Sequence, residues 1–144
     1  MQPQAIFKQA QYLHQQGQFA EAEQLYRQIL QTSPTHGETL HLLGIVCTQQ
    51  GKHEEAISWI LKAIIRQPTQ AACYNNLGLV YAKLKMWDKA IEAYNVVTRL
   101  TNNLPDVWFN LANASKAQDK LEQAIKYYQK PSSQTQSTLK PCII

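Results

Sequence analysis

Cysteine and histidine are scarce in this 144-residue chain, and neither is arranged as a metal-binding motif. Cys47, Cys73 and Cys142 are odd in number, far apart and without CxxC spacing, which argues against a disulfide framework and a zinc site. The four histidines include no i, i+4 pair and no HExxH motif. We therefore expect no metal site and no cofactor.

Motifs of catalysis are also missing. The sequence has no GxSxG motif, no glycine-rich phosphate loop and no paired acidic motif. The adjacent Glu54 and Glu55 are interpreted as solvated residues of an outer surface. These absences predict a protein that is not an enzyme.

Long apolar runs and blocks of one charge are absent as well. No stretch approaches the roughly 18 apolar residues of a membrane span, and the N-terminus has no signal-like apolar run. The 14 basic and 10 acidic side chains are scattered, so the net charge of +4 favours solubility more than any particular partner. We expect a soluble, cytoplasmic protein that binds no membrane, and we do not expect it to bind nucleic acid.

Glycine and proline are few, but they recur at one fixed interval along the chain, and several other residue types recur at the same interval. Small and large side chains occupy separate columns of this repeat. The matching positions are Gly17 and Gly51; Pro34 and Pro68; Leu43, Leu77 and Leu111; Ala22, Ala56, Ala90 and Ala124; Tyr26, Ile60, Tyr94 and Tyr128; and Ala10, Gly44, Gly78 and Ala112. The chain is therefore built from copies of one structural unit.

Each copy has the apolar spacing of two helices. Gly17 and Gly51 fall where a first helix turns, and Pro34 and Pro68 fall where a second helix ends. Thr35 followed by Glu38 has the form of a capping box that opens the next helix. The predicted helix pairs span about residues 3–31, 37–66, 71–100 and 105–130.

The columns "L..LG..C...G....A...I..A....P" in residues 40–68 and "Y..LG..Y........A...Y..V" in residues 74–97 resemble tetratricopeptide repeats. Four copies, at about 3–36, 37–70, 71–104 and 105–130, form a predicted repeat domain over residues 1–130. Two positions depart from the family pattern. Asn102 replaces the expected proline of the third copy, which predicts a reshaped corner, and Pro131 predicts an early end of the last helix.

The resemblance implies an all-α fold, a right-handed superhelical solenoid of antiparallel helix hairpins, whose first helices line a concave groove. Gly78 is then small because its helix crosses the partner helix near Ala90 and Tyr94. The wider inner surface includes His14, Gln15, Leu42 and Gln49. The residues predicted to bind a peptide in the groove are Lys8, Gln11, His41, Ile45, Asn75, Asn76, Leu79, Lys83, Phe109, Asn110, Asn113 and Lys116.

Asn76 and Asn110 occupy the same column of successive repeats in this lining and resemble the asparagine ladder of O-linked N-acetylglucosamine transferases, which holds extended polypeptide. An asparagine amide can both donate to and accept from a peptide unit. The alternative is that both asparagines only cap or hydrate helix surfaces. The sequence leaves these two interpretations open.

Three functional classes remain. The first is a non-catalytic scaffold that binds a protein or peptide, as an extended segment or a helix, in its groove. The second is the N-terminal, substrate-presenting segment of a larger transferase, and the third, weakest, is an RNA-binding helical repeat. Residues 131–144 are predicted to be a disordered or linker tail, and an uncapped C-terminal hairpin would permit self-association.

Overall fold

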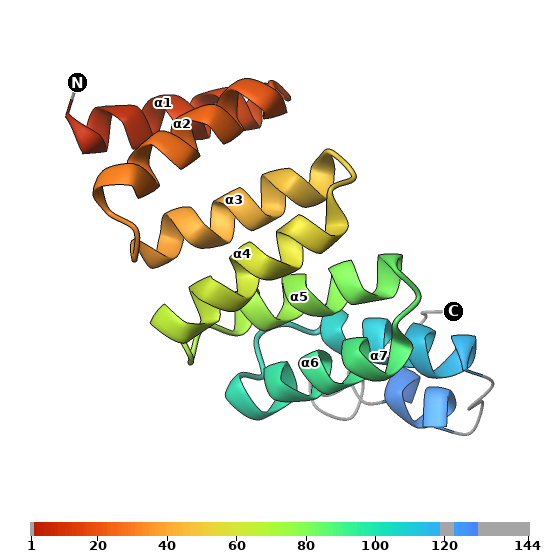
Figure 1. The fold of residues 1–144 in the computed structure, drawn as a ribbon. Helices are drawn as coiled ribbons and strands as arrows, with labels where there is room; N and C mark the ends of the chain where they lie inside the picture. Colours follow the sequence, from red (N-terminus) through yellow and green to blue (C-terminus); the bar gives the residue numbers. More distant parts are fainter. Residues whose placement is uncertain (1, 119–122, 130–144) are drawn as a thin grey trace. The chain divides into compact units, whose positions relative to one another are not determined.

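The computed structural model describes residues 2–118 and 123–129, and these residues form helices joined by turns, without strands (Figure 1). The helices are α1 (Pro3–Gln15), α2 (Phe19–Thr32), α3 (Gly37–Gln49), α4 (His53–Arg66), α5 (Ala71–Lys83), α6 (Trp87–Leu100) and α7 (Asp106–Ala117). Residues 123–129 are helical as well. The predicted all-α class is confirmed, and the predicted helix pairs match these bounds closely; the predicted tail, residues 131–144, lies outside the described residues.

The chain divides into two compact units inside α5. Unit 1 (residues 1–76) contains α1 to α4 and the start of α5, and unit 2 (residues 77–144) contains the rest of α5, α6, α7 and the helical residues 123–129. In unit 1, α1 packs on α2, α2 on α3, and α3 on α4; in unit 2, α6 packs on α7. In each unit, helices that follow one another in the chain pack against one another.

The turns within the first three hairpins share one conformation, although one of them lacks glycine. Gly17 and Gly51 have φ of 81° and 82°, a left-handed conformation that glycine adopts without steric cost. Lys85, which takes the place of Gly51 in the next repeat, has φ of 60°. In all three turns the N–H of this residue donates to the carbonyl three residues earlier, and the following N–H donates to the carbonyl five residues before it. The fold therefore imposes this turn even on a residue that disfavours it.

The corners between hairpins follow the prolines. The C-cap residues that follow α2 and α4 have nearly identical dihedrals: Ser33 has φ −134° and ψ 71°, and Gln67 has φ −133° and ψ 65°. A proline follows each of them. Thr101, which ends α6 and precedes Asn102, is instead extended, with φ −158° and ψ 155°. Its side-chain oxygen accepts a hydrogen bond from the N–H of Asn103 (2.9 Å). The predicted reshaping of this corner is confirmed.

The predicted capping box of α3 is wrong by one residue. The N-cap is His36, whose Nδ1 accepts a hydrogen bond from the N–H of Thr39 (3.3 Å) and also contacts the Thr39 hydroxyl (2.7 Å). Because the helix begins at Gly37, Thr35 lies outside the capping position. The imidazole nitrogen accepts this bond in the way that an aspartate or serine oxygen does. The capping-box motif contains only serine or threonine and glutamate or glutamine, so it does not predict a histidine cap.

The repeated small residues let the two helices of each hairpin approach closely. Ala22, Ala56 and Ala90 are completely buried. A Cβ atom placed on Gly44 would lie 2.5 Å from Cγ1 of Ile60, and one on Gly78 would lie 2.4 Å from Cε1 of Tyr94. Atoms cannot approach this closely, so a larger residue would have to displace the partner side chain. The predicted reason for Gly78 is confirmed, and the same reason applies to Gly44.

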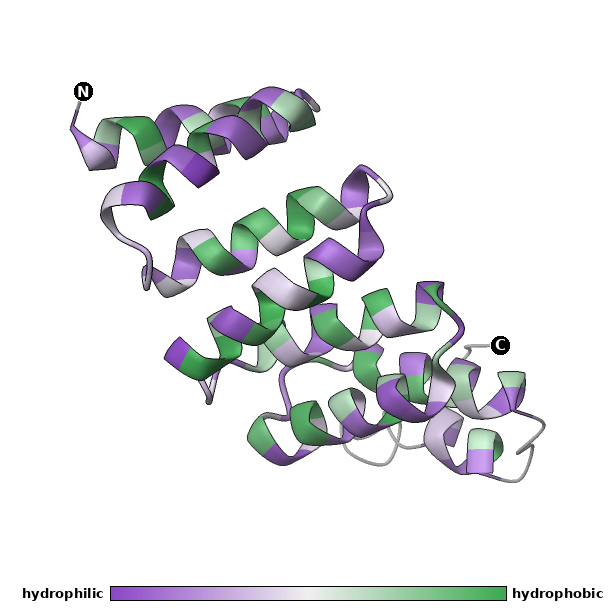
Figure 2. Ribbon diagram, in the orientation of Figure 1, coloured by the Kyte–Doolittle hydropathy of each residue, from purple (hydrophilic) through white to green (hydrophobic). Residues whose placement is uncertain are grey.

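Helix α3 is apolar around most of its circumference, whereas α2 and α4 show polar and apolar sides (Figure 2). Its buried residues include Leu40, Leu43, Val46 and Cys47. The reason is that α3 packs against both α2 and α4 and so has two sides to bury. The remaining strip of α3 carries His41, Leu42 and Ile45, all half-buried, and this strip belongs to the predicted lining.

Candidate functional site

Six of the predicted groove residues lie in unit 1, on first helices of hairpins. Lys8 is exposed and the other five are half-buried, so all six are reachable from solvent. They come from α1 (Lys8, Gln11), α3 (His41, Ile45) and α5 (Asn75, Asn76). Their placement in the structure is compatible with the predicted role, which stays a prediction.

The structure brings His41 of α3 and Asn76 of α5 together. Asn76 Nδ2 lies 2.8 Å from His41 Nε2, so the amide donates a hydrogen bond to an unprotonated imidazole nitrogen. Burial lowers the pKa of His41, which favours the neutral ring that this bond requires. The bond occupies one N–H of Asn76. An asparagine amide has a second N–H and a carbonyl oxygen, and these are the groups that a peptide unit needs.

A pocket of about 430 Å³ lies at the end of the first hairpin in unit 1. We name it the α1–α3 pocket. It is lined by Gln11, His14, Gln15, Gly17, Phe19, Tyr26, Leu42 and Gln49. Gln11 belongs to the predicted peptide-binding set, and four more belong to the wider inner surface expected from the sequence. The pocket therefore gives the predicted lining a concave feature within unit 1.

His14 holds the α1–α3 pocket together. Its Nε2 lies 2.6 Å from Oε1 of Gln49 on α3, and its Nδ1 lies 3.0 Å from the hydroxyl of the buried Tyr26 on α2. A neutral ring satisfies both contacts when Nε2–H donates to Gln49 and Nδ1 accepts from Tyr26. The rings of Phe19 and Tyr26 also meet His14 edge-on, with centroids 5.8 Å away in each case. Three helices thus position one imidazole.

The sequence analysis did not predict the contacts of His14, although the spacing of residues along the chain contains a signal for one of them. His14 and Gln49 are 35 residues apart, and so are His41 and Asn76. A separation of one repeat plus one residue places two side chains as neighbours on the first helices of successive repeats. A search for hydrogen-bonding pairs at this interval would have found both bonds.

The other six predicted groove residues lie in unit 2. Leu79 and Asn110 are half-buried, and the rest are exposed; the six are Leu79, Lys83, Phe109, Asn110, Asn113 and Lys116. Two of them contact Tyr128 in the helical residues 123–129. The Tyr128 hydroxyl donates to Oδ1 of Asn113 (2.9 Å), and the Phe109 and Tyr128 ring centroids are 5.9 Å apart. Part of the predicted lining on α7 is therefore engaged by the next helix of the same hairpin.

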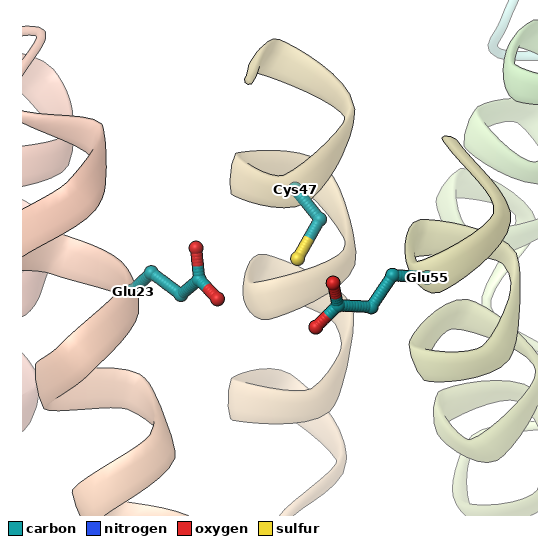
Figure 3. Close-up of side chains that lie close together, drawn as sticks. All are labelled: Glu23, Cys47 and Glu55. Carbon is teal, nitrogen blue, oxygen red and sulfur yellow. The ribbon is translucent and has the colours of Figure 1, made fainter. Parts of the chain in front are cut away.

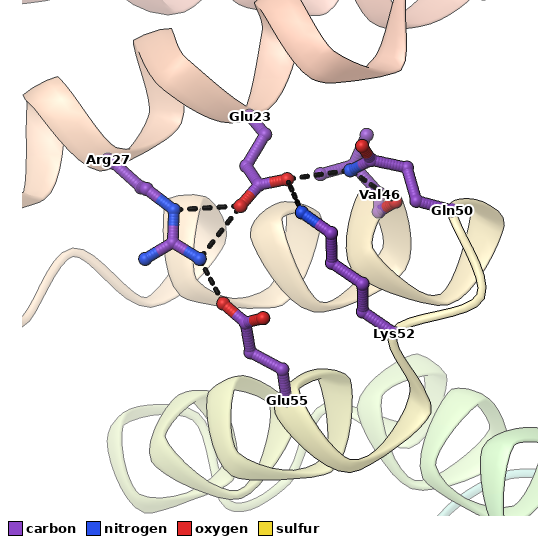
Figure 4. A network of polar contacts seen from close by, with 6 residues as sticks. All are labelled: Glu23, Arg27, Val46, Gln50, Lys52 and Glu55. Atoms are coloured by element: carbon purple, nitrogen blue, oxygen red, sulfur yellow. Dashed lines mark hydrogen bonds and ion pairs between the residues drawn. The ribbon is translucent and has the colours of Figure 1, made fainter.

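A network of charged and polar side chains surrounds Glu23 in unit 1, between α2 and the turn that joins α3 to α4 (Figure 4). The carboxylate accepts hydrogen bonds from Arg27 Nε (2.8 Å), Gln50 Nε2 (2.7 Å) and Lys52 Nζ (3.0 Å). Burial alone would raise the pKa of Glu23, but these three donors outweigh it and lower the pKa. Glu23 is therefore a buried carboxylate that stays ionised because its partners stabilise the charge.

The same network gives a partner to Glu55, which was interpreted as a solvated outer-face residue and whose side chain is 41% exposed. Glu55 of α4 forms an ion pair with Arg27 of α2. Arg27 also bonds Glu23, so one guanidinium connects two helices that belong to different repeats. Glu23 and Arg27 form an i, i+4 ion pair on α2, and Glu55 extends it.

Glu23, Cys47 and Glu55 bring three atoms that could bind a metal within 4.8 Å of one another (Figure 3). Both carboxylates are already engaged by the Arg27 guanidinium, and Glu23 also by Lys52. Burial raises the pKa of the Cys47 thiol to about 11, so this sulfur is protonated at neutral pH. The positive charge that balances these carboxylates therefore comes from Arg27 and Lys52. We interpret the cluster as an ion-pair network and not as a metal site.

Comparisons with known proteins identify the repeat. Three family models described as tetratricopeptide repeat match residues 13–77, 71–104 and 105–130. Photosystem I assembly protein Ycf3 from Synechococcus sp. (strain CC9902) is 34% identical over 98 residues, which are 64% of this chain and 55% of that protein. The human protein O-mannosyl-transferase TMTC1 is 27% identical over 125 residues, 84% of this chain but 14% of that protein. The chain thus spans about half the length of the Ycf3 relative.

Solved structures share the fold. A crystal structure of MamA is 25% identical, with a TM-score of 0.81, and covers 86% of this chain and 72% of that one. MamA from Desulfovibrio magneticus RS-1 reaches a TM-score of 0.88 at 19% identity, over 95% of this chain and 78% of that chain. The predicted fold class, a solenoid of antiparallel helix hairpins, is confirmed. A protein-interaction scaffold with protein partners is the general function that the repeats and these relatives support.

In the described part of the chain, no helix has both the length and the apolar character needed to cross a membrane. The repeated columns, the hairpins and the three matching models agree on one assignment. The chain belongs to the tetratricopeptide repeat family.

Proposed function

We propose that unit 1 binds an extended peptide segment of a protein partner along its first helices, without catalysing a reaction. The α1–α3 pocket receives side chains of the segment. The Asn76 amide, held by His41, binds one of its peptide units. Lys8, Gln11, Ile45 and Asn75 are the remaining unit 1 residues of this proposed site.

The observation that carries the proposal is that side chains on this surface hold one another in place, while the amide groups of Asn76 and Gln49 keep N–H groups that can bind a peptide. His41 fixes Asn76 at 2.8 Å, and Tyr26 and Gln49 fix His14 at 3.0 and 2.6 Å. Groups that are fixed beforehand lose less conformational entropy when a ligand binds. Each additional hydrogen bond to a peptide would contribute about 0.5 to 1.5 kcal/mol.

The relatives support a partner that is a protein. One of them is named as an assembly protein for photosystem I, which is a role toward other polypeptides. Because this chain spans 55% of that protein, the partner of this chain is a separate question. The residues predicted on α7 in unit 2, including Asn110 and Lys116, stay a prediction for a second binding surface within that unit.

The two alternative functions receive less support. The likeness to TMTC1 is compatible with a substrate-presenting segment of a transferase. This chain covers only 14% of TMTC1, however, so the likeness does not favour the transferase function. RNA binding would require a basic stripe. The residues that line the α1–α3 pocket include no aspartate, glutamate, lysine or arginine. A peptide ligand fits this lining better than a phosphate backbone.

The test is a peptide selection followed by a measured affinity. Peptides from a random display library are selected on the full chain, and one selected peptide is labelled for fluorescence anisotropy. Asn76→Ala should weaken its binding about three- to tenfold, because one or two hydrogen bonds are lost. His41→Phe removes the partner that orients Asn76 and should have a smaller effect in the same direction.

Asn95→Ala is the matched control, because Asn95 is also half-buried and helical but lies on α6, a second helix. It should leave the affinity unchanged. The proposal fails if Asn76→Ala and Asn95→Ala bind the selected peptide equally well, or if selection yields no peptide that saturates the full chain.

A further inference from the structure

We infer that the partner peptide presents a lysine or arginine side chain, and that a second pocket of unit 1 binds it. This pocket, of about 150 Å³, lies where α1 and α3 begin and where α2 ends. We name it the Glu38 pocket. The inference rests on the proposed function, because it adds the chemistry of one ligand side chain to the same first helices. It is carried by an apolar and aromatic wall that stands beside a carboxylate.

The walls of the Glu38 pocket fit the apolar part of one long side chain. They include Pro3, Phe7, Ile29, Ser33, His36 and Glu38. The volume is below the roughly 300 to 1,000 Å³ of small-molecule sites, so the pocket admits a single side chain rather than a whole compound. The methylene groups of lysine or arginine pack on such walls while the charged end stays near water.

The Phe7 ring is held in place and still reachable. Its centroid lies 6.4 Å from that of Tyr26 and 5.6 Å from that of His36, which it meets edge-on. Phe7 is half-buried, so part of its ring is open to a ligand. The face of an aromatic ring attracts an ammonium or guanidinium group within about 6 Å. The wall therefore favours a cationic side chain over an aliphatic one of equal length.

Glu38 gives the pocket its charge. It is the only aspartate, glutamate, lysine or arginine among the residues that line the pocket. Its carboxylate forms no ion pair or hydrogen bond with another described residue, whereas Glu23 and Glu55 are paired with Arg27. The helix ends at the pocket add partial charges of both signs, each about half an elementary charge. The full negative charge of Glu38 therefore decides that a cation is preferred.

The first test is a selection on three forms of the full chain: wild type, Glu38→Gln and Glu54→Gln. Glu54 is the matched control, because both glutamates are exposed and lie in the first turn of a helix, α3 and α4 respectively. Each change removes one negative charge and the same favourable interaction with a helix N-terminus. The probe is a random peptide display library, and the selected peptides are sequenced and aligned.

Lysine and arginine together should be enriched about threefold at one peptide position on the wild type and on Glu54→Gln, but not on Glu38→Gln. General electrostatic attraction cannot produce this result. The chain carries a net charge of +4, which favours acidic peptides.

The second test is a measured affinity. One peptide selected on the wild type is labelled for fluorescence anisotropy, and its enriched basic residue is changed to methionine, which is unbranched and uncharged. This change should weaken binding about three- to fivefold on the wild type and on Glu54→Gln, as expected for a solvent-accessible ion pair. On Glu38→Gln it should have no effect, because the carboxylate that it depends on is absent. Circular dichroism checks that each variant remains helical.

The inference is overturned if selected peptides show no basic preference, if Glu38→Gln keeps that preference, or if the change to methionine weakens binding equally on Glu38→Gln and the wild type. Failure of the proposed function has a different signature. If no peptide saturates the full chain, both the function and this inference are wrong. If peptides bind and depend on Asn76 but lack the basic residue, peptide binding stands and only the role of the Glu38 pocket is wrong.

Discussion

The junction between α2 and α3 in unit 1 is charged, whereas the junction between α6 and α7 in unit 2 has an apolar residue at the same repeat position. Glu23 is buried in the first and bonded by Arg27, Gln50 and Lys52. Ile91, two repeats later, takes the position of Glu23 and is half-buried. One interaction that spans this second junction joins Gln118 Nε2 to Asp88 Oδ1 (2.6 Å).

This difference shows which positions the repeat constrains. The small residues inside each hairpin are buried alike in both units, as Ala56 and Ala90 illustrate. The junction position accepts either a bonded carboxylate or an isoleucine, because its surroundings can satisfy a charge with long side chains that reach in from the edge. The hairpin interior offers no such freedom.

Enlarging the glycines inside the hairpins should have the largest effect, and it should affect both units alike. Gly44→Leu and Gly78→Leu would each drive a side chain into the partner helix, against Ile60 and Tyr94 respectively. We expect each to reduce the free energy of unfolding by ~3 kcal/mol, the upper part of the usual range for overpacking, despite the ~1 kcal/mol gained in helix propensity. Urea denaturation monitored by circular dichroism measures this loss.

Ala72→Leu is the control for this pair, since Ala72 is exposed on α5. It should change the free energy of unfolding by less than ~0.5 kcal/mol. If either glycine variant is as stable as Ala72→Leu, the close approach of the hairpin helices in that unit is wrong.

Changing Glu23 tests whether the two junction types are interchangeable. Glu23→Ala removes the shared acceptor of Arg27, Gln50 and Lys52 and should destabilise unit 1. We expect ~2 kcal/mol rather than the larger loss of a fully buried pair, because the Arg27 and Lys52 side chains are 40% and 45% exposed and can be hydrated.

The double change Glu23→Ile with Arg27→Leu gives α2 the residue types found at the same positions of the next repeat, where Ile57 and Leu61 stand. It should restore most of the stability lost in Glu23→Ala, since an apolar replacement of similar volume needs no counterion. Urea denaturation of both variants measures the difference. A double variant that is less stable than Glu23→Ala would show that the charged junction is required in unit 1.

Acid should weaken the charged junction selectively. Because the pKa of Glu23 is lower in the folded chain than its ordinary value of 4.5, the ionised carboxylate stabilises the fold above that value. This contribution is lost as the pH falls below about 4.5 and through the folded pKa. The free energy of unfolding should therefore fall more steeply between pH 5 and pH 3 in the wild type than in the Glu23→Ile, Arg27→Leu variant. If the wild type and the double variant lose stability equally between pH 5 and pH 3, Glu23 does not contribute to the loss of stability in acid.

Much of the fold could be predicted from the sequence because its strongest constraints recur at one interval along the chain. The columns of Ala56 and Gly78 predict the hairpins, and the glycines and prolines predict the turns. The cap at His36 was missed because it depends on one imidazole and on the hydroxyl of Thr39, which a repeat pattern does not reveal.

The candidate site was less predictable, because it depends on contacts between repeats. Family precedent placed Asn76 and Gln11 on an accessible surface of unit 1, but it gave no sign that His41 binds Asn76. The bonds from Arg27 to Glu23 and Glu55 likewise depend on which way one long side chain turns. Periodicity fixes positions on a helix, whereas such pairings depend on side-chain rotamers in two neighbouring repeats.

The smallest expected effect concerns the turn that differs between the units. Lys85 in unit 2 adopts φ of 60°, where a side chain costs ~1 kcal/mol, whereas Gly51 in unit 1 adopts φ of 82° without that cost. Lys85→Gly should therefore stabilise unit 2, but only by ~0.5 kcal/mol, because glycine also gains entropy in the unfolded chain. Gly51→Lys should destabilise unit 1 by ~0.5 kcal/mol, since nothing lies within 4 Å of a Cβ there and the backbone cost of ~1 kcal/mol is partly offset by the lower entropy of the unfolded chain. Thermal unfolding of the two variants measures these opposite shifts, with Lys89→Gly, an exposed lysine inside α6, as the control that should be destabilising. A Lys85→Gly variant that melts below the wild type would mean that the lysine side chain contributes more to this turn than its backbone conformation costs.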